Sequence, residues 1–108
     1  MIKRLWHGWT TKENADRYFE VLSTQVIPSI EAKNIKGYRN FEVLRKEYDD
    51  EVEFFTQITF DSLQNVIEFQ GDDYTRAYVP EAAQALLKRW DEYCEHYDVL
   101  DQSIKGPS

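Results

Sequence analysis

The segment GYRNFEVLRKEYDDEVEFFTQITFDSL, residues 37–63, decides the fold. Polar and apolar residues alternate over Tyr38–Lys46 and again over Glu51–Phe60, which predicts two β-strands. The polar tetrapeptide Glu47–Asp50 between them has room only for a tight turn, so the two strands are expected to form an antiparallel hairpin. One face of the second strand is expected to carry Val52, Phe54, Thr56, Ile58 and Phe60.

A helical pattern precedes the hairpin. Thr10–Glu13 reads as a capping box, in which the first and last side chains each bond the other's backbone amide. Apolar residues then recur at spacings of three and four, which predicts one long helix whose apolar stripe comprises Ala15, Tyr18, Phe19, Leu22, Val26 and Ile30. Pro28 is expected to kink this helix, because it cannot donate a hydrogen bond to the carbonyl of Thr24. Gly37 marks the turn into the hairpin.

Two more helices are expected after the hairpin. Asp61 or Ser62 caps the first of them, whose apolar residues are Leu63, Val66, Ile67 and Phe69. Gly71–Asp73 ends this helix. Pro80 suits the first position of the next helix, and the residues expected to face inward from it are Ala82, Ala83, Leu86, Leu87 and Trp90.

The two ends of the chain are expected to be strands, Met1–Trp9 and Glu92–Leu100. In the first, Leu5, His7 and Trp9 point to one face, and Ile2, Arg4 and Trp6 point to the other. The order is therefore strand, helix, strand, strand, helices, strand. This order predicts an α+β, ferredoxin-like βαββαβ fold with an extra short helix and an antiparallel sheet. One domain is expected over residues 1–100, followed by a flexible tail, residues 101–108.

The sheet is expected to be covered by helices on one face only, because its crossovers are right-handed. The other face would carry Trp6 or Trp9 together with Phe or Tyr rings of the other strands. An uncovered apolar patch of this size is typical of an interface. We therefore expect a homodimer, in which a second copy packs sheet against sheet about a two-fold axis.

Composition narrows the partners further. The formal net charge of −7 disfavours both nucleic acid and an anionic membrane surface. Cys94 is the single cysteine, so an internal disulfide and a multi-thiolate metal site are excluded. The chain shows no signal segment and no apolar run of membrane-spanning length, which favours a cytoplasmic location.

Five short stretches carry a resemblance to a known family: Ile2–Thr10, Gly37–Arg39, Glu51–Phe54, Phe60–Leu63 and Glu95–Val99. The chain resembles the antibiotic-biosynthesis monooxygenase-like family of dimeric α/β barrels, from Ile2 to about Leu100. That superfamily includes cofactor-independent oxygenases, haem-degrading enzymes, isomerases and members without known activity. The resemblance therefore implies the fold more specifically than a reaction.

An oxygenase of this kind deprotonates a phenolic substrate, and the electron-rich anion then reacts with oxygen itself. The resemblance implies His7 or His96 as the base, and Arg39 or Arg45 as the group that stabilises the anion. Its flat aromatic or quinone-like substrate would be held by a pocket of rings, expected to be Trp6, Trp9, Tyr18, Phe69, Tyr74, Tyr78 and Trp90. Two plainer readings stay open: that the histidines are buried with a backbone partner, and that the rings are core and dimer seam.

No cofactor and no metal are predicted. The haem-degrading branch needs an Asn on the first strand, a Trp at the end of the second helix and a His ligand soon after. The matching positions hold Trp6 or His7, then Phe69, then Tyr78, which argues against haem. Tight spacing of metal ligands is absent. Cys94 shares a face with His96, and a plain buried thiol is the commoner state for such a cysteine.

Two functions are weighed. The first is a small cofactor-independent monooxygenase-like enzyme with a pocket between helices and sheet that His7 and His96 reach. The second is a non-catalytic dimeric module that binds a small apolar ligand or a partner. It predicts a ring-filled core without a cavity of drug-sized volume, about 300 Å³. A haem-binding protein that uses Tyr78 is a third option, and a haem titration tests it.

Overall fold

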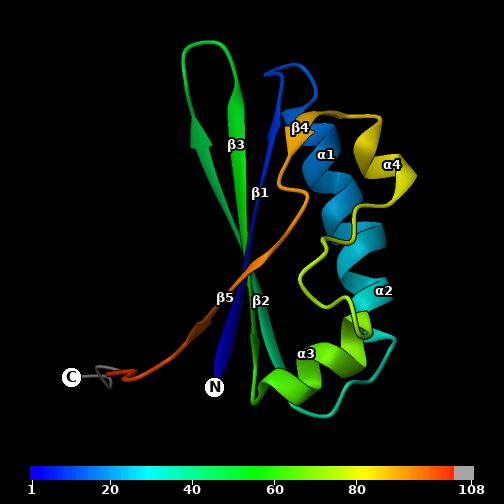
Figure 1. Ribbon diagram of the computed structural model, residues 1–108. Coiled ribbons are helices and arrows are strands. Elements are labelled where there is room, and N and C mark those ends of the chain that lie inside the picture. Colours follow the sequence, from blue (N-terminus) through cyan, green and yellow to red (C-terminus); the bar gives the residue numbers. More distant parts are fainter. Residues whose placement is uncertain (104–108) are drawn as a thin grey trace, which may run out of the picture.

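The computed structural model describes residues 1–103 and shows a sheet with helices on one side (Figure 1). Residues 104–108 of the expected tail lie outside the described part. The elements are β1 (Ile2–Thr10), α1 (Ala15–Val21), a π-helical turn η1 (Leu22–Val26), α2 (Ile27–Glu31), β2 (Tyr38–Glu47), β3 (Val52–Phe60), α3 (Leu63–Gln70), α4 (Glu81–Gln84), β4 (Leu87–Trp90) and β5 (Glu95–Asp98).

The sheet is antiparallel, with the order β2-β3-β1-β4, and β5 pairs with β1 beyond β4. The hairpin of β2 and β3 is confirmed. The closing strand expected over Glu92–Leu100 is present but shorter, as β5 (Glu95–Asp98), and a further strand that was not expected, β4, shares the same edge of β1. Gly8 pairs with Trp90 of β4, and Ile2 pairs with Asp98 of β5. The chain leaves the sheet edge between these strands.

The expected third helix is wrong in its second half. It ends at Gln84, and Leu87–Trp90 form β4 instead. The Thr10 hydroxyl donates to the carbonyl of Leu86, and the backbone of β4 then pairs with β1. Backbone groups along the free edge of β1 need partners, and this need overrides the helical spacing of the apolar residues.

The capping box expected at Thr10–Glu13 is also wrong. Thr10 is used by Leu86, as described, and the helix begins only at Ala15 after the cap residue Asn14. Thr11 accepts a hydrogen bond from the Asn14 amide instead, at 3.1 Å. The interruption expected at Pro28 takes the form of the π-helical turn η1, which ends two residues before the proline and in which the Ile27 amide donates to the carbonyl of Leu22, five residues back.

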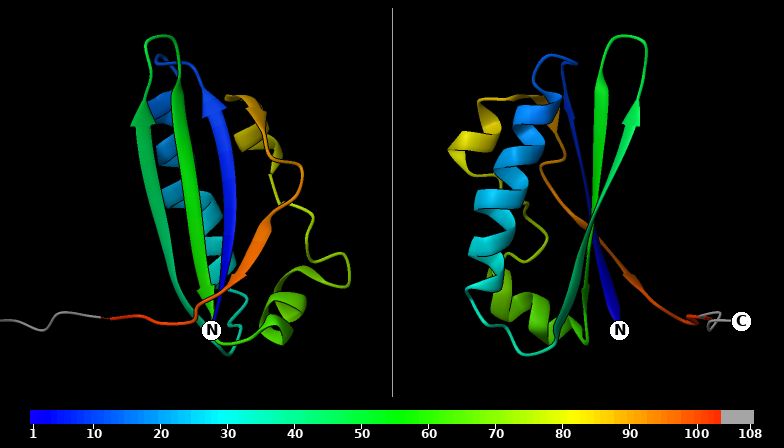
Figure 2. Two further views of the ribbon diagram at one scale, coloured as in Figure 1. Left: turned by 60° about the vertical axis from the view of Figure 1, so that its left-hand side comes forward. Right: turned by 180° about the vertical axis from the view of Figure 1, so that it is seen from behind.

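Two layers follow from this arrangement. All helices lie on the same side of the sheet (Figure 2), as right-handed crossovers predict. The even-numbered residues of β1 are buried beneath them, and so are Val52, Phe54, Thr56, Ile58 and Phe60 of β3. Tyr18 of α1 packs edge-on against Phe54 with 4.9 Å between the ring centroids. No helix among residues 1–103 is long and apolar enough to cross a bilayer.

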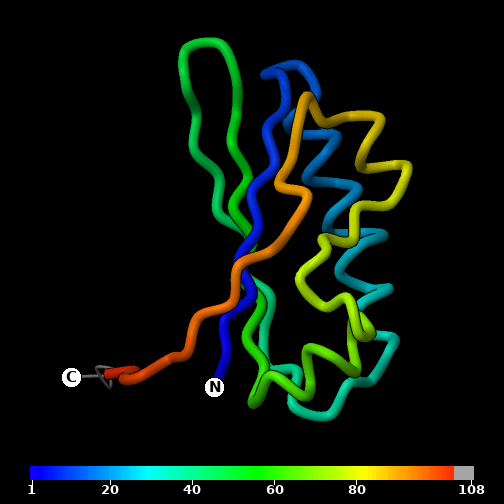
Figure 3. Tube along the Cα trace, in the orientation of Figure 1, coloured from blue at the N-terminus to red at the C-terminus, as the bar shows by residue number. Residues whose placement is uncertain are grey.

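The opposite face of the sheet has no covering layer in the single chain, as the course of the trace shows (Figure 3). We call it the open face, and its apolar and aromatic residues are Leu5, His7, Trp9, Leu44 and Phe55. His7 and Phe55 stack with centroids 4.3 Å apart, and His7 and Trp9 with centroids 5.8 Å apart. Of the two tryptophans expected on this face, Trp9 lies here and Trp6 lies beneath the helices.

Ser62 caps α3, as predicted, and the cap is reciprocal. The Ser62 hydroxyl accepts from the Asn65 amide, and the Asn65 side chain accepts from the Ser62 amide. Gly37 packs against this cap with φ of +99°. A methyl group at Gly37 would overlap the Asn65 side-chain oxygen, whereas a methyl group at Gly71, where φ is +92°, would meet nothing within 4 Å.

We predict that Gly37→Ala lowers the free energy of unfolding more than Gly71→Ala does. Both changes carry the backbone strain of a positive φ, about 1–3 kcal/mol. Gly37→Ala also displaces Asn65 and so loses the cap, which adds about 1 kcal/mol. Urea unfolding followed by circular dichroism measures the difference. Equal losses in the two variants would contradict the contact between Gly37 and the cap.

Candidate functional site

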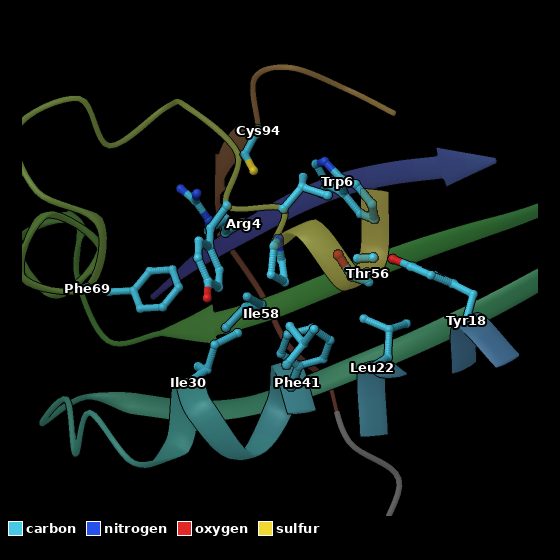
Figure 4. A pocket seen from close by; sticks show the side chains of 15 residues that line it. Arg4, Trp6, Tyr18, Leu22, Ile30, Phe41, Thr56, Ile58, Phe69 and Cys94 are labelled. Carbon is cyan, nitrogen blue, oxygen red and sulfur yellow. The ribbon is translucent and has the colours of Figure 1, made fainter. Parts of the chain in front are cut away.

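A pocket lies between the sheet and the helical segment α1–η1–α2 (Figure 4). Its walls are mainly apolar, and they include Trp6 from β1, Phe41 from β2, Ile58 from β3 and Phe69 from α3. The volume of the pocket is about 50 Å³, and about 520 Å³ of empty space lies between the lining residues when the part open to solvent is counted. We call this pocket the cleft. Its size in this conformation suits a few atoms rather than a whole drug-sized molecule.

Arg4 is the charged residue of the cleft wall. It projects from β1 beneath the helices and is only 3% exposed. Its Nη1 donates to the carbonyl of Tyr74, and its Nη2 donates to the carbonyl of Arg76 at 3.0 Å. A second contact of Nη1 reaches Nε2 of His96, also at 3.0 Å. The guanidinium therefore fastens the segment after α3 to the sheet.

The surroundings of Arg4 are neutral. No carboxylate among residues 1–103 lies within ion-pair distance of it. Burial lowers the pKa of Arg4, and the nearest group that opposes this effect is Cys94. Burial in turn raises the pKa of the Cys94 thiol, so the thiol is protonated at neutral pH. Arginine remains charged even when its pKa is lowered, and no carboxylate in the described part of the chain compensates the charge of Arg4.

His96 sits beside Arg4 as a neutral acceptor. Because a guanidinium can only donate, Nε2 of His96 must carry the lone pair and Nδ1 the proton. Burial, aided by the charge of Arg4, lowers the pKa of His96 to about 4. The ring also meets Tyr74 edge-on, with 5.3 Å between centroids. A base of this pKa whose lone pair is already engaged is weak at neutral pH.

His7 lies on the open face, and so the expectation that both histidines reach one cleft is wrong. Position 7 is odd and position 4 is even on β1, and odd and even side chains point to opposite faces. Nδ1 of His7 is 2.8 Å from Oδ2 of Asp91, and the same oxygen accepts from the His7 backbone amide. The carbonyl of Asp91 accepts from Nε1 of Trp6 at 2.8 Å. Asp91 therefore holds one residue on each face of β1.

The predicted ring residues divide between several places. Trp6, Tyr18, Phe69 and Tyr78 line the cleft. Trp9 is on the open face, where Arg89 lies 4.6 Å from its ring. Tyr74 contacts His96 next to the cleft, and Trp90 is partly buried against the core in β4.

Arg39 and Arg45 lie outside the cleft lining. Arg39 forms a two-bond ion pair with Asp61 on the surface, and Arg45 pairs with Asp16 and Glu47. Arg4 was the functional candidate that sequence reasoning missed. Its signal was present, because it stands in phase with Ile2 and Trp6 on a face that had to be covered. A lone arginine at a buried strand position requires an explanation.

Comparisons in sequence find no matching protein-family model and no matching curated protein. Solved structures do match over 96% of this chain. A Bacillus cereus protein proposed to be an antibiotic biosynthesis monooxygenase matches with a TM-score of 0.67 at 13% identity, over 97% of its own length. A dimeric ferredoxin-like protein from an uncultured marine organism matches with a TM-score of 0.63 at 11% identity, over 97% of its length. The protein Rv0793 from Mycobacterium tuberculosis matches with a TM-score of 0.55 at 14% identity, over its full length, 100%.

The chain shares its fold with these proteins. The expected α+β, ferredoxin-like architecture with an antiparallel sheet is thereby confirmed. At these identities the likeness shows the fold alone, and a fold does not determine a function. The reaction must be argued from the cleft.

The cleft does not fit a haem. Its volume is only about 50 Å³, and the one phenol in its lining that is exposed enough to serve as a ligand is Tyr78, which is 48% exposed. His96 is no substitute ligand while its Nε2 accepts from Arg4. Among residues 1–103, no group of three or more His, Cys, Asp or Glu converges as a metal site would.

We predict that stability falls as pH drops from about 6.5 to about 4. His96 binds a proton near its ordinary pKa of 6.5 when unfolded but only near 4 when folded, so the unfolded state binds more protons in this window. The full shift corresponds to roughly 3 kcal/mol, which the partial exposure of His96 reduces to about 1–2 kcal/mol.

Urea unfolding at pH 7, 5.5 and 4.5 measures this loss, with His96→Gln as the matched variant. The glutamine oxygen can still accept from Arg4 but cannot titrate. We expect a flatter profile in the variant. Parallel profiles in the two proteins would remove His96 from the acid sensitivity.

Proposed function

We propose that the cleft binds a small, flat, largely apolar molecule, and that the chain acts on it as a cofactor-independent monooxygenase-like enzyme. The substrate class is an aromatic or quinone-like metabolite. The observation that carries this proposal is the aromatic lining of the cleft, to which Trp6, Tyr18, Phe69 and Tyr78 contribute. Convergent rings around a few polar groups are typical of small-molecule sites.

Arg4 and His96 are the polar groups that the proposal uses. A phenolic substrate must lose a proton before its anion can react with oxygen, and a positive charge in a water-poor site stabilises that anion. Arg4 supplies such a charge at the cleft wall. His96 becomes available as a proton acceptor only when its Nε2 is released from Arg4. His7 and Arg39 stay predictions on which this proposal does not depend, because both lie away from the cleft.

A non-catalytic binding module is the second candidate. The small volume of the cleft favours the binding module, since about 50 Å³ is far below the volume of a drug-sized site. The engaged lone pair of His96 favours it as well. In this reading the cleft accepts a small apolar guest and performs no chemistry on it.

Two neighbouring alanines of α4 provide the test of the cleft. Ala83 is buried in the lining, whereas Ala82 is exposed. We predict that Ala83→Leu fills the cleft and abolishes ligand binding, whereas Ala82→Leu leaves binding unchanged. Overpacking of Ala83→Leu costs about 1–3 kcal/mol, so circular dichroism must first show a folded variant.

Binding is measured by calorimetry with a panel of small phenols, and turnover by oxygen consumption with the same panel. Binding and oxygen uptake that both disappear in Ala83→Leu support the enzyme. Binding without oxygen uptake supports the binding module. Ligand binding that is equal in both variants rules the cleft out as the site.

We also propose that the chain is a homodimer joined through the open face. Trp9 and Phe55 lie there with Leu5 and Leu44, and helices cover only the other side. One structural neighbour is described as a dimeric ferredoxin-like protein. A second copy is the simplest cover for a ring-rich sheet face. A cytoplasmic location is part of the proposal, because the single cysteine, Cys94, is a free buried thiol.

We predict that Phe55→Asp weakens self-association at least tenfold, because the interface would then bury a charge on each copy. Leu63→Asp is the control, since Leu63 is exposed on α3, away from the open face. Sedimentation equilibrium measures the association. Wild type that sediments as a 12.9 kDa monomer at micromolar concentration would refute the dimer.

A further inference from the structure

We infer that the ligand of the cleft is an anion, and that its charged oxygen group binds Arg4. This inference rests on the proposed binding function of the cleft and names its substrate class: a flat apolar body that carries one carboxylate or phenolate group. The observation behind it is a buried guanidinium in the cleft wall to which the described chain offers no negative partner.

Arg4 lacks a negative partner within residues 1–103, although carboxylates are plentiful and most of the other arginines have one. The chain contains 20 Asp and Glu residues against 13 Lys and Arg, so carboxylates are plentiful. The arginines at positions 39, 45, 76 and 89 each lie within 3.3 Å of one or more carboxylate oxygens. All four are at the surface, where an ion pair contributes little. Arg17, which also forms no ion pair in the part of the chain that the structure describes, is exposed to water, whereas Arg4 is buried, where the absence of a counter-charge costs most.

Every contact of Arg4 is neutral. Two backbone carbonyls and the His96 ring accept its hydrogen bonds, and the ring of Phe69 lies 5.5 Å from its guanidinium carbon. A buried charge costs several kcal/mol of desolvation, which neutral acceptors offset only in part. A ligand anion would recover much of that cost, and this gain would appear as binding affinity and as selectivity for charge.

Arg4 keeps donors for such a ligand. A guanidinium has five N–H groups, and the contacts with Tyr74, Arg76 and His96 use three of them. The Nε–H and one Nη2–H have no partner among residues 1–103. A carboxylate or phenolate oxygen is the acceptor that a guanidinium binds most strongly.

Two positively charged side chains, Arg4 and Lys33, lie against the ring of Phe69 at one end of the cleft. Arg4 lies on this ring from within the cleft wall, between Phe69 and Cys94 (Figure 4). Lys33 lies 4.5 Å from the centroid of the same ring and is exposed to solvent. Its charge favours an approaching anion locally, against the net charge of −7 of the whole chain. The remaining walls are mainly apolar, so we expect the ligand body to be mainly apolar too.

Benzoate and benzamide test the inference, because they share shape and differ in charge. We expect wild type to bind benzoate at least tenfold more tightly than benzamide by calorimetry. Arg4→Met, which keeps an unbranched apolar stem and removes the charged guanidinium, is expected to reduce that ratio to about one. Arg17→Met is the matched control, since Arg17 is exposed on α1 and its loss changes net charge equally.

Arg4→Lys is a second variant, included in case Arg4→Met fails to fold for want of the guanidinium hydrogen bonds. It retains the charge, and a preference for benzoate should persist in it. A wild-type ratio near one, or an unchanged ratio in a folded Arg4→Met, would overturn the inference and leave the cleft as a site for neutral molecules. If neither compound binds, or if binding survives Ala83→Leu, the cleft itself fails as a site and the proposed function fails with it.

Discussion

The central position of β1 is the constraint on which the rest of the structure depends. It pairs with β3 along one edge and with β4 and β5 along the other, so its backbone is fixed at both sides. Its side chains can then only alternate between the two faces. Arg4 and Trp6 are thereby assigned to the cleft, and His7 and Trp9 to the open face. The two faces of this one strand therefore serve different proposed roles: one face serves ligand binding and the other serves self-association.

The cleft and the open face solve different physical problems. The helices already remove the apolar atoms of the cleft from water. What the cleft lacks is a negative charge to balance that of the buried Arg4. On the open face, by contrast, the rings of His7, Phe55 and Trp9 are stacked but have no second layer to shield them from water. A small ionic ligand meets the first need and a second apolar surface meets the second.

Much of the fold was predictable from the sequence, because alternation in β1, β2 and β3 and the Ser62 cap are local signals. The end of the chain was not, because pairing of Leu87–Trp90 with β1 is a contact between distant segments. The apolar residues there do recur at helical spacing, but the segment forms a strand because the backbone groups at the edge of β1 need hydrogen-bond partners. Site prediction failed for a similar reason. His7 and His96 attract attention as titratable residues, while Arg4 reveals its role only once the phase of β1 is compared with the layer that covers it.

Asp91 has a consequence for how the two faces relate. Its carbonyl is bonded to the indole of Trp6, and its carboxylate is bonded to the backbone and ring of His7. It also stands in the stretch where the chain departs from the sheet edge, between β4 and β5. One residue outside the regular strands thus hydrogen-bonds a ring on each face of the sheet. Because the bond to the Trp6 indole comes from the main chain, replacement of the Asp91 side chain would remove the contact with the His7 ring and leave the acceptor of the indole in place.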